Sequence, residues 1–251
     1  MSHRLSPHRL SLVATLLLSA ATAQSHQVWL EQDASGAKLY FGEFGDNLRE
    51  ASPGLLDKFV APTAQRIGTT AQPLTVNKTT TGFALSAAAA KGESLVAEDT
   101  RYPITERKDG DKMIRTAYMP AARLLTTFDK QVPQLPLDVV PTGQHSKDGA
   151  EVQVFYKGQV LPKVKVELVT PLGWAKEYKT DEQGKLTVSL PWKGTYVLEA
   201  KHADNTGGER TTSGGTEKFD RASYVTSLTM TQAEGWPALP ASPAAKPNVM
   251  K

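Results

Sequence analysis

The stretch Thr195-Tyr196-Val197-Leu198-Glu199-Ala200-Lys201-His202 indicates the fold more clearly than any other part of the chain. Side chains alternate between the two faces of a β-strand, and β-branched and aromatic residues favour strands. Tyr196, Leu198 and Ala200 then form one apolar face, which ends in His202. This alternation predicts a strand with one face in a core and His202 at the rim of that core.

Similar alternating runs precede this stretch at short, regular intervals. They cover residues 151–156, 163–170, 175–180 and 185–190. The turns between them are Lys157-Gly158, Leu172-Gly173, Asp181-Glu182-Gln183-Gly184 and Lys193-Gly194. Short strands at this spacing predict an all-β protein, with a β-sandwich of immunoglobulin-like or transthyretin-like character.

A second pair of strand-like runs lies near the N-terminus, at residues 26–31 and 38–44. The cluster Asp33-Ala34-Ser35-Gly36 between them favours a turn, so the pair predicts a β-hairpin. On a regular strand His26 and Val28 share one face, and Glu31 lies on the other.

A change of composition near residue 142 indicates a boundary. Prolines at 133, 136 and 141 are followed by the Asp148-Gly149 turn. The prediction is an N-terminal β region over 26–142 and a C-terminal β-sandwich module over 143–232, forming one large sandwich or two packed β modules. Residues 233–251 are rich in proline and alanine, and we expect an extended, disordered tail there.

Residues 1–25 have the order of a secretory signal peptide: basic residues, an uncharged apolar run over 10–20, then small residues. Cleavage after Ala23 leaves Gln24 first, and cleavage after Ser25 leaves His26 first; both fit the small-x-small rule. The apolar run is shorter than the roughly 20 residues that a spanning helix needs, so we expect no membrane span in the mature chain. The signal predicts a periplasmic protein.

The composition excludes several classes of protein. The chain has no cysteine, which excludes disulfide bonds and thiolate chemistry. The net charge of +3 falls to about +1 without the two arginines of the signal segment, which gives no electrostatic case for nucleic acid. The common phosphate-loop, esterase and zinc-protease motifs are absent. We therefore expect a binding protein rather than an enzyme.

Three histidines and three acids in the mature chain form a set of nitrogen and oxygen ligands without sulfur. They are His26, His145, His202, Glu31, Glu43 and Asp204. Such ligands suit nickel, cobalt, copper(II), zinc or iron rather than copper(I). Strand alternation argues against Glu31 as a partner of His26 at one metal ion.

Two of these residues have a structural alternative. Glu43 shares a strand face with large apolar residues, and such an acid needs a partner, either a base such as Arg49 or a metal ion. His202 at its strand end, close to Asp204, is either a hydrogen-bonding residue or a metal ligand.

The position of signal cleavage changes the chemistry of His26. If His26 is the first mature residue, its α-amine and a ring nitrogen chelate one metal ion together. One further imidazole would complete a three-nitrogen arrangement that favours copper(II) or nickel(II). A mature N-terminus at Gln24 removes this chelate.

Six short stretches carry a family resemblance and together extend over nearly the whole mature chain. They are His26–Glu31, Tyr40–Phe44, Ser52–Lys58, Thr180–Gly184, Tyr196–His202 and Tyr224–Thr229. With them the chain resembles a bacterial periplasmic domain family of unknown function that is described as a cobalt/nickel transport component.

The resemblance implies a periplasmic, all-β accessory of metal uptake. His26 matches the family's early His before an aromatic-Leu-Glu run, and His202 matches its second His-bearing strand end. Gln27 and Gln32 stand where an acid and a proline are usual, which leaves the ligand set and the metal open.

The sequence thus predicts a periplasmic β-sandwich protein that binds a divalent transition metal through His26, His202 and Glu43. Nickel or cobalt is favoured, and copper or iron are further candidates. The expected partners are the metal ion and a membrane transporter or outer-membrane receptor of an uptake system, with no nucleic acid. Two alternatives stay open: a structural or envelope-interaction module without metal, and a copper enzyme with an amino-terminal His site.

Overall fold

The computed structural model describes residues 26–248 apart from residue 213. The predicted signal peptide and its two cleavage positions lie outside the described residues. Within them the chain is almost entirely β-structure, with one 3-10 helix, η1 (Leu55–Lys58), and no α-helix. No helix in this part of the chain has the length and hydrophobicity to cross a membrane. The predicted all-β fold is confirmed.

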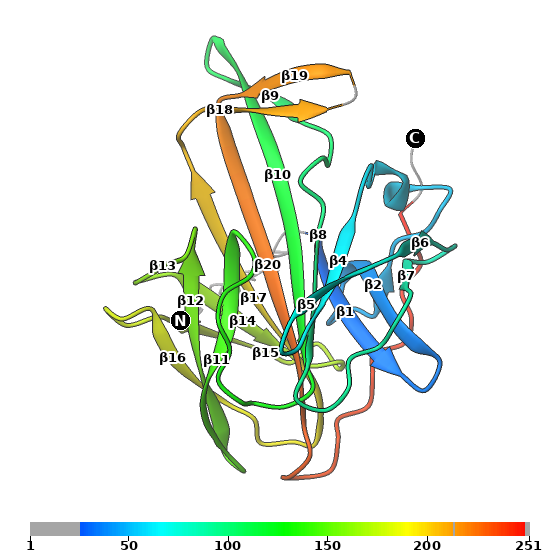
Figure 1. Cartoon of the computed structure of the whole chain (residues 1–251), viewed down its shortest axis with the longest axis vertical. Coiled ribbons are helices and arrows are strands. Elements are labelled where there is room, and N and C mark those ends of the chain that lie inside the picture. The colour runs from blue at the N-terminus through cyan, green and yellow to red at the C-terminus, as the bar shows by residue number, and fades with distance from the viewer. Residues whose placement is uncertain (1–25, 213, 249–251) are drawn as a thin grey trace, which may run out of the picture.

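The largest sheet has nine strands and runs through the centre of the molecule (Figure 1). Its strand order is β15-β14-β17-β20-β10-β8-β4-β5, with β9 paired to one end of β10. Only β10 and β20 pair in parallel among the described strands of this sheet. The strands are β4 (Thr63–Ile67), β5 (Ala71–Leu74), β8 (Ser94–Glu98), β9 (Thr105–Asp109), β10 (Lys112–Leu125), β14 (Lys165–Val169), β15 (Ala175–Lys179), β17 (Gly194–Asp204) and β20 (Arg221–Gln232).

Two smaller sheets lie on either side of the central one (Figure 1). The five-stranded sheet contains β1 (Gln27–Asp33), β2 (Gly36–Glu43), β3 (Leu48–Arg49), β6 (Val76–Lys78) and β7 (Phe83–Leu85). The four-stranded sheet contains β11 (Leu137–Ser146), β12 (Gly149–Tyr156), β13 (Gln159–Val160) and β16 (Lys185–Ser189). A separate hairpin, β18 (Gly208–Thr212) and β19 (Gly215–Phe219), contacts β10.

Alternation along β17 and β20 explains how the central sheet contributes side chains to two cores. Leu198 and Leu228 pair across these strands and pack with the four-stranded sheet. Val197, one residue along, packs on the other face against Trp29 of β1. Because successive side chains point to opposite faces, the central sheet forms a layer of both sandwiches. The β-sandwich prediction is confirmed.

The predicted boundary between residues 142 and 143 falls inside β11. The central sheet contains strands from both sides of that boundary, β10 from the first part and β17 and β20 from the second. The largest apolar cluster of the first part draws on residues 28–124, and that of the second on residues 125–230. The two parts therefore have largely separate cores and share a sheet.

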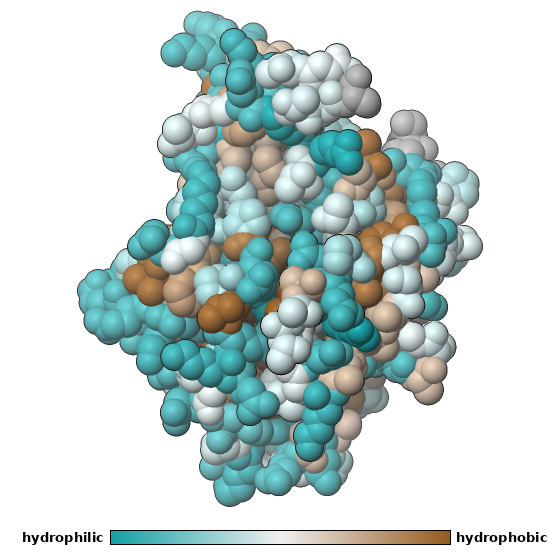
Figure 2. Space-filling view, in the orientation of Figure 1, coloured by the Kyte–Doolittle hydropathy of each residue, from teal (hydrophilic) through white to brown (hydrophobic). Residues whose placement is uncertain are grey.

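The described part of the tail follows the surface of the body in an extended conformation (Figure 1). Its backbone N–H groups at Ser242 and Ala245 donate to the carbonyl oxygens of Pro171 and Asn47, at 2.8 and 3.3 Å. The sequence predicted an extended, disordered tail. These bonds attach it, because an extended segment cannot pair its N–H groups with its own carbonyls and turn carbonyls on the body accept them instead. The face shown in Figure 2 is mostly hydrophilic, with apolar residues in scattered patches.

Candidate metal site

The β1–β2 hairpin brings His26 and Glu43 together. Gln27 is opposite Gly42, and continuing this antiparallel register by one residue places Glu43 across from His26. The Nδ1 atom of His26 lies 3.5 Å from Oε1 of Glu43. Two of the three predicted metal ligands are therefore neighbours.

Glu50 is a third member of the site, and the sequence prediction missed it. After a turn at Asn47, β3 pairs with the end of β2, and the Glu50 N–H donates to the Phe41 carbonyl at 2.8 Å. The Glu50 side chain is fully buried, and its Oε1 lies 2.5 Å from Nε2 of His26. The turn-forming run Gly45-Asp46-Asn47, one residue after β2, was the available signal for this second hairpin.

The contacts of Glu50 define which ring nitrogen of His26 is free. An ionised carboxylate only accepts hydrogen bonds, so Nε2 of a neutral His26 carries the proton and donates it to Glu50. Asn248 donates to the same carboxylate from its backbone N and its Nδ2, at 3.0 and 2.5 Å. The lone pair of Nδ1 then faces Glu43.

Negative charge exceeds positive charge around the ring. Glu43 and Glu50 both contact the imidazole, and Asp46 acts on Glu43 through a hydrogen bond and through its charge. Burial, the Asp46 hydrogen bond and the charges of Asp46 and Glu50 raise the pKa of Glu43, although His26 lowers it. Glu43 therefore retains a proton more readily than an ordinary glutamate does.

A small cavity of about 30 Å³ lies behind Glu43, between the hairpin and strands β14 and β17. Glu167, Glu199 and Lys201 line it together with Glu43 and Gln27. Glu199 is buried and paired with Lys201, and burial raises its pKa. The cavity has room for about one water-sized group, and Glu43 is in contact with both this space and His26.

His202 is not part of this site. Glu199 and Lys201 of β17 face Glu43, and alternation sends the next residue, His202, to the opposite face of the central sheet. There its ring packs on Tyr156 of β12, with the ring centroids 4.3 Å apart. The predicted pairing of His26 with His202 therefore does not occur in the structure, because the central sheet separates the two residues.

The other candidate residues have structural partners elsewhere. His145 stacks on Phe128 with ring centroids 3.9 Å apart. Asp204 accepts hydrogen bonds from Tyr156 and Lys157, which hold its pKa below the usual range. Glu31 lies away from His26, as alternation predicted.

Arg49, the alternative partner that the sequence offered for Glu43, instead binds Glu31 at 2.8 and 3.1 Å. Across residues 26–248, with 213 left aside, no set of three or more His, Cys, Asp or Glu side chains is arranged to hold a metal ion as it stands. Direct ligation would therefore begin from the His26–Glu43 pair.

The fold and site together define an all-β sandwich protein with an imidazole–carboxylate site at one end of its first hairpin. The sequence model of DUF4198, a domain of unknown function, matches residues 23–204, and the chain belongs to this family. No curated protein and no solved structure matches the chain. The matched range includes His26, Glu43 and Glu50 and ends before the tail that supplies Asn248.

Proposed function

We propose that this chain is a periplasmic binding protein that holds a divalent transition metal, nickel or cobalt in the first place, as cargo for an uptake system. The metal ion binds at Nδ1 of His26 and at Glu43. The protein binds and releases the ion without chemical turnover, and its delivery partner is a membrane transporter or an outer-membrane receptor.

The observation that carries the proposal is the hydrogen bond between His26 and the buried Glu50. Histidines that bind metals usually donate their second ring N–H to a carboxylate or a carbonyl, which sets the tautomer and the ring orientation. Glu50 has this role for His26, and it leaves Nδ1 directed at Glu43. Tyr118 adds a further restraint, since its hydroxyl donates to the His26 carbonyl at 3.0 Å.

The charge of the site supports a cation as the ligand. A metal ion would displace the proton that Glu43 tends to retain and would offset the surplus of carboxylates around the ring. Nitrogen and oxygen donors without sulfur favour nickel, cobalt, copper(II), zinc or iron over copper(I).

The ligand set of this proposal differs from the one that the sequence suggested. His202 is not a ligand in this proposal, and His26 and Glu43 remain as the two side-chain ligands. Two ligands leave coordination positions open, which suits an ion that has to be passed on. Asp46, bonded to Glu43, and the α-amine of His26 after cleavage behind Ser25 are the nearest additional donors.

A structural role is the second candidate, and the contacts of Asn248 favour it. Asn248 binds Glu50 from the tail, so the His26 cluster also attaches the C-terminal segment to the body. In that case the cluster stabilises the fold and binds no metal.

Titration of the exported protein with Ni²⁺, Co²⁺, Cu²⁺ and Zn²⁺ separates the two candidates. His26→Ala is expected to weaken nickel or cobalt binding by at least about 100-fold, because it removes a ligand. His202→Ala is the matched control and is expected to bind like the unmodified protein. Equal affinities of the His26→Ala variant and the unmodified protein, micromolar or weaker for all four ions, would refute the metal proposal.

The mature N-terminus decides whether the α-amine takes part. Intact-mass measurement distinguishes a first residue Gln24 from a first residue His26. If His26 is first, the amine adds a nitrogen donor, and the preference is expected to move toward copper(II) and nickel(II).

A further inference from the structure

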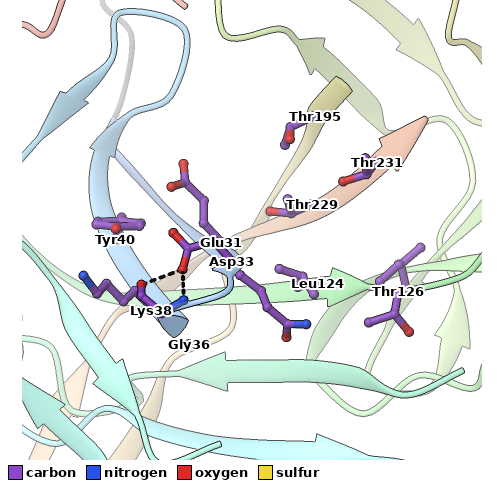
Figure 3. Close-up of a pocket in the computed structure, with 13 residues that line it drawn as sticks. Glu31, Asp33, Gly36, Lys38, Tyr40, Leu124, Thr126, Thr195, Thr229 and Thr231 are labelled. Carbon is purple, nitrogen blue, oxygen red and sulfur yellow. Dashed lines mark hydrogen bonds between the residues drawn. The ribbon is translucent and has the colours of Figure 1, made fainter. Parts of the chain in front are cut away.

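A second cavity lies at the opposite end of β1 from His26. It has a volume of about 330 Å³ and lies between the β1–β2 hairpin and the central sheet (Figure 3). Glu31, Asp33, Lys38 and Tyr40 form the hairpin side. This volume is near the lower end of the roughly 300–1,000 Å³ that ligand pockets occupy.

The central sheet presents a group of hydroxyls to this cavity. Thr229 and Thr231 are two residues apart on β20 and therefore share a face, and Thr195 of β17 is paired with Thr231. Figure 3 shows the three side chains projecting toward the hairpin residues. Three threonines from two adjacent strands thus form one wall.

Thr229 lacks a hydrogen-bond partner. The residue is only 3% exposed, and its Oγ1 makes no hydrogen bond with any other described residue. Leaving a buried hydroxyl unpaired is unfavourable, whereas a bound molecule with a hydroxyl group would satisfy it. The neighbouring Thr226 also lacks a partner for its hydroxyl, but it is not among the residues that line the cavity.

The charges at the cavity are already balanced. Glu31 is bound by Arg49 at 2.8 and 3.1 Å and lies opposite Lys38 in the hairpin register. Asp33 accepts hydrogen bonds from Ser35, and these lower its pKa. Among the lining residues Glu31 and Asp33 are acids and Lys38 is a base, and Arg49, outside the lining, neutralises Glu31. With Arg49 included the formal charges sum to zero, so the charges nearest the cavity favour neither a cation nor an anion.

The groups of the cavity that can still form hydrogen bonds are the hydroxyls and the carboxylate lone pairs. Carboxylates with spare lone pairs accept hydrogen bonds from hydroxyl groups, and threonine hydroxyls both donate and accept. Burial raises the pKa of the Tyr40 phenol, which therefore stays a neutral donor and acceptor. Leu124 contributes an apolar surface beside these groups.

We propose that this cavity binds a small, neutral, hydroxyl-rich molecule of about the size of one sugar ring. Such a ligand supplies the partner that Thr229 lacks and leaves the internal ion pairs intact. The inference goes beyond the metal proposal, because the cavity shares no lining residue with the His26 cluster.

Titration of the full exported chain with neutral monosaccharides, followed by calorimetry and by amide chemical shifts, tests the proposal. Glucose, galactose, mannose and arabinose are the probes, at up to about 20 mM, which covers millimolar affinities. Glucosamine and glucuronate are charged probes of similar shape. We expect saturable binding of at least one neutral sugar, at least about tenfold tighter than that of its charged analogue.

Variants of β20 identify the site. Thr229→Val keeps the shape but removes the hydroxyl, and it is expected to weaken sugar binding at least about tenfold. Thr229→Ser keeps a hydroxyl and is expected to retain binding, which separates recognition from a folding defect. Thr226→Val is the matched control and is expected to bind within about twofold of the unmodified protein.

Three results would overturn the proposal. They are the absence of saturable binding by every neutral probe, tighter binding of a charged analogue, and an equal loss of binding in Thr226→Val and Thr229→Val. Each of these leaves the metal proposal untouched, since that proposal depends on His26, Glu43 and Glu50, and none of the three lines this cavity.

Discussion

Asp138 and Glu50 are both fully buried carboxylates, and they differ in what surrounds them. Asp138 binds the Arg123 guanidinium through two hydrogen bonds, at 3.0 and 2.6 Å, and also accepts from the backbone N–H groups of Gln134 and Leu135. Arg123 is itself fully buried. One permanent cation and one anion thus neutralise each other between the central and four-stranded sheets.

Glu50 has a different kind of partner. Its hydrogen bonds come from an imidazole and from Asn248 in the tail, and Glu43, which is itself hydrogen-bonded to Asp46, lies near it. The His26 side chain is 24% exposed, so solvent reaches the ring. A guanidinium keeps its charge and has no lone pair to offer, whereas an imidazole can gain a proton or bind a metal ion. Burial of a carboxylate therefore indicates a structural pair in one place and a candidate site in the other.

The largest expected effect is on the structural pair. Arg123→Met leaves Asp138 buried without its cation, and we expect a loss of about 3–5 kcal/mol in the free energy of unfolding. Urea denaturation of the two proteins measures this difference. A loss below about 1 kcal/mol would show that water or another cation compensates for the arginine.

The exposed pair Lys165–Glu177 provides the control for this prediction. Lys165→Met is expected to leave the free energy of unfolding nearly unchanged, because exposed ion pairs contribute little to stability. The double variant Arg123→Met/Asp138→Leu is expected to recover part of the lost stability, because it removes the uncompensated charge.

The second effect concerns the orientation of His26. Glu50→Gln keeps the shape of the side chain but weakens the charge-assisted bond to Nε2, and we expect about 10–100-fold weaker nickel or cobalt binding. Metal titration at constant pH measures the change. Glu31→Gln serves as the control, since Glu31 is bound to Arg49 on the other face of β1. Equal losses in both variants would contradict the role given to Glu50.

A smaller effect is expected at the tail. Asn248→Ala removes the side-chain hydrogen bond to Glu50, and we expect a loss of about 1 kcal/mol in stability. Thermal or urea unfolding measures it against Lys246→Ala, an exposed change in the same segment. If the two variants are equally stable, Asn248 does not contribute to the cluster in solution.

The smallest effect is the pH dependence that Glu43 confers on the metal-free protein. Its pKa in the folded state is raised above the ordinary value of 4.5, so the folded protein holds this proton more tightly than the unfolded chain. The resulting stabilisation is complete below the unfolded pKa and is lost as the pH rises through the raised folded pKa. Glu43→Gln removes this loss and is expected to be slightly more stable than the unmodified protein at pH 7, by less than about 1 kcal/mol.

Stability measured in the presence of a chelator between pH 4 and pH 8 tests this sign. Glu209→Gln, at an exposed acid on β18, is the control and is expected to follow the unmodified protein. A Glu43→Gln variant that loses stability relative to the unmodified protein as the pH rises would contradict the predicted direction.

Much of the fold could be predicted because strand alternation is a local property. The stretch from Thr195 to His202 forms the core of β17 (Gly194–Asp204), and the predicted hairpin near the N-terminus became β1 and β2. The parallel pairing of β10 with β20 could not be predicted, since it joins segments about a hundred residues apart and leaves no local pattern.

The site was predictable in part for the same reason. Alternation and the Asp33–Gly36 turn place Glu43 beside His26, and they send Glu31 to the other face. Glu50 was missed because its position next to His26 depends on β3. This strand has only two residues, so it shows no periodicity in the sequence. The strand that carries His202 was predicted correctly. The predicted position of His202 was wrong because the sequence does not show which sheet packs on each face of that strand.

The sequence by itself determined which side chains of each strand share a face, because that alternation follows from the backbone of a single strand. It also determined the β-class and the His26–Glu43 neighbourhood, which a single hairpin produces. Only the tertiary structure decided which faces meet. The central sheet lies between the five-stranded and four-stranded sheets, so it separates His202 from His26 and directs Thr229 into the second cavity. Such contacts between layers depend on burial between distant segments, and no local pattern specifies them.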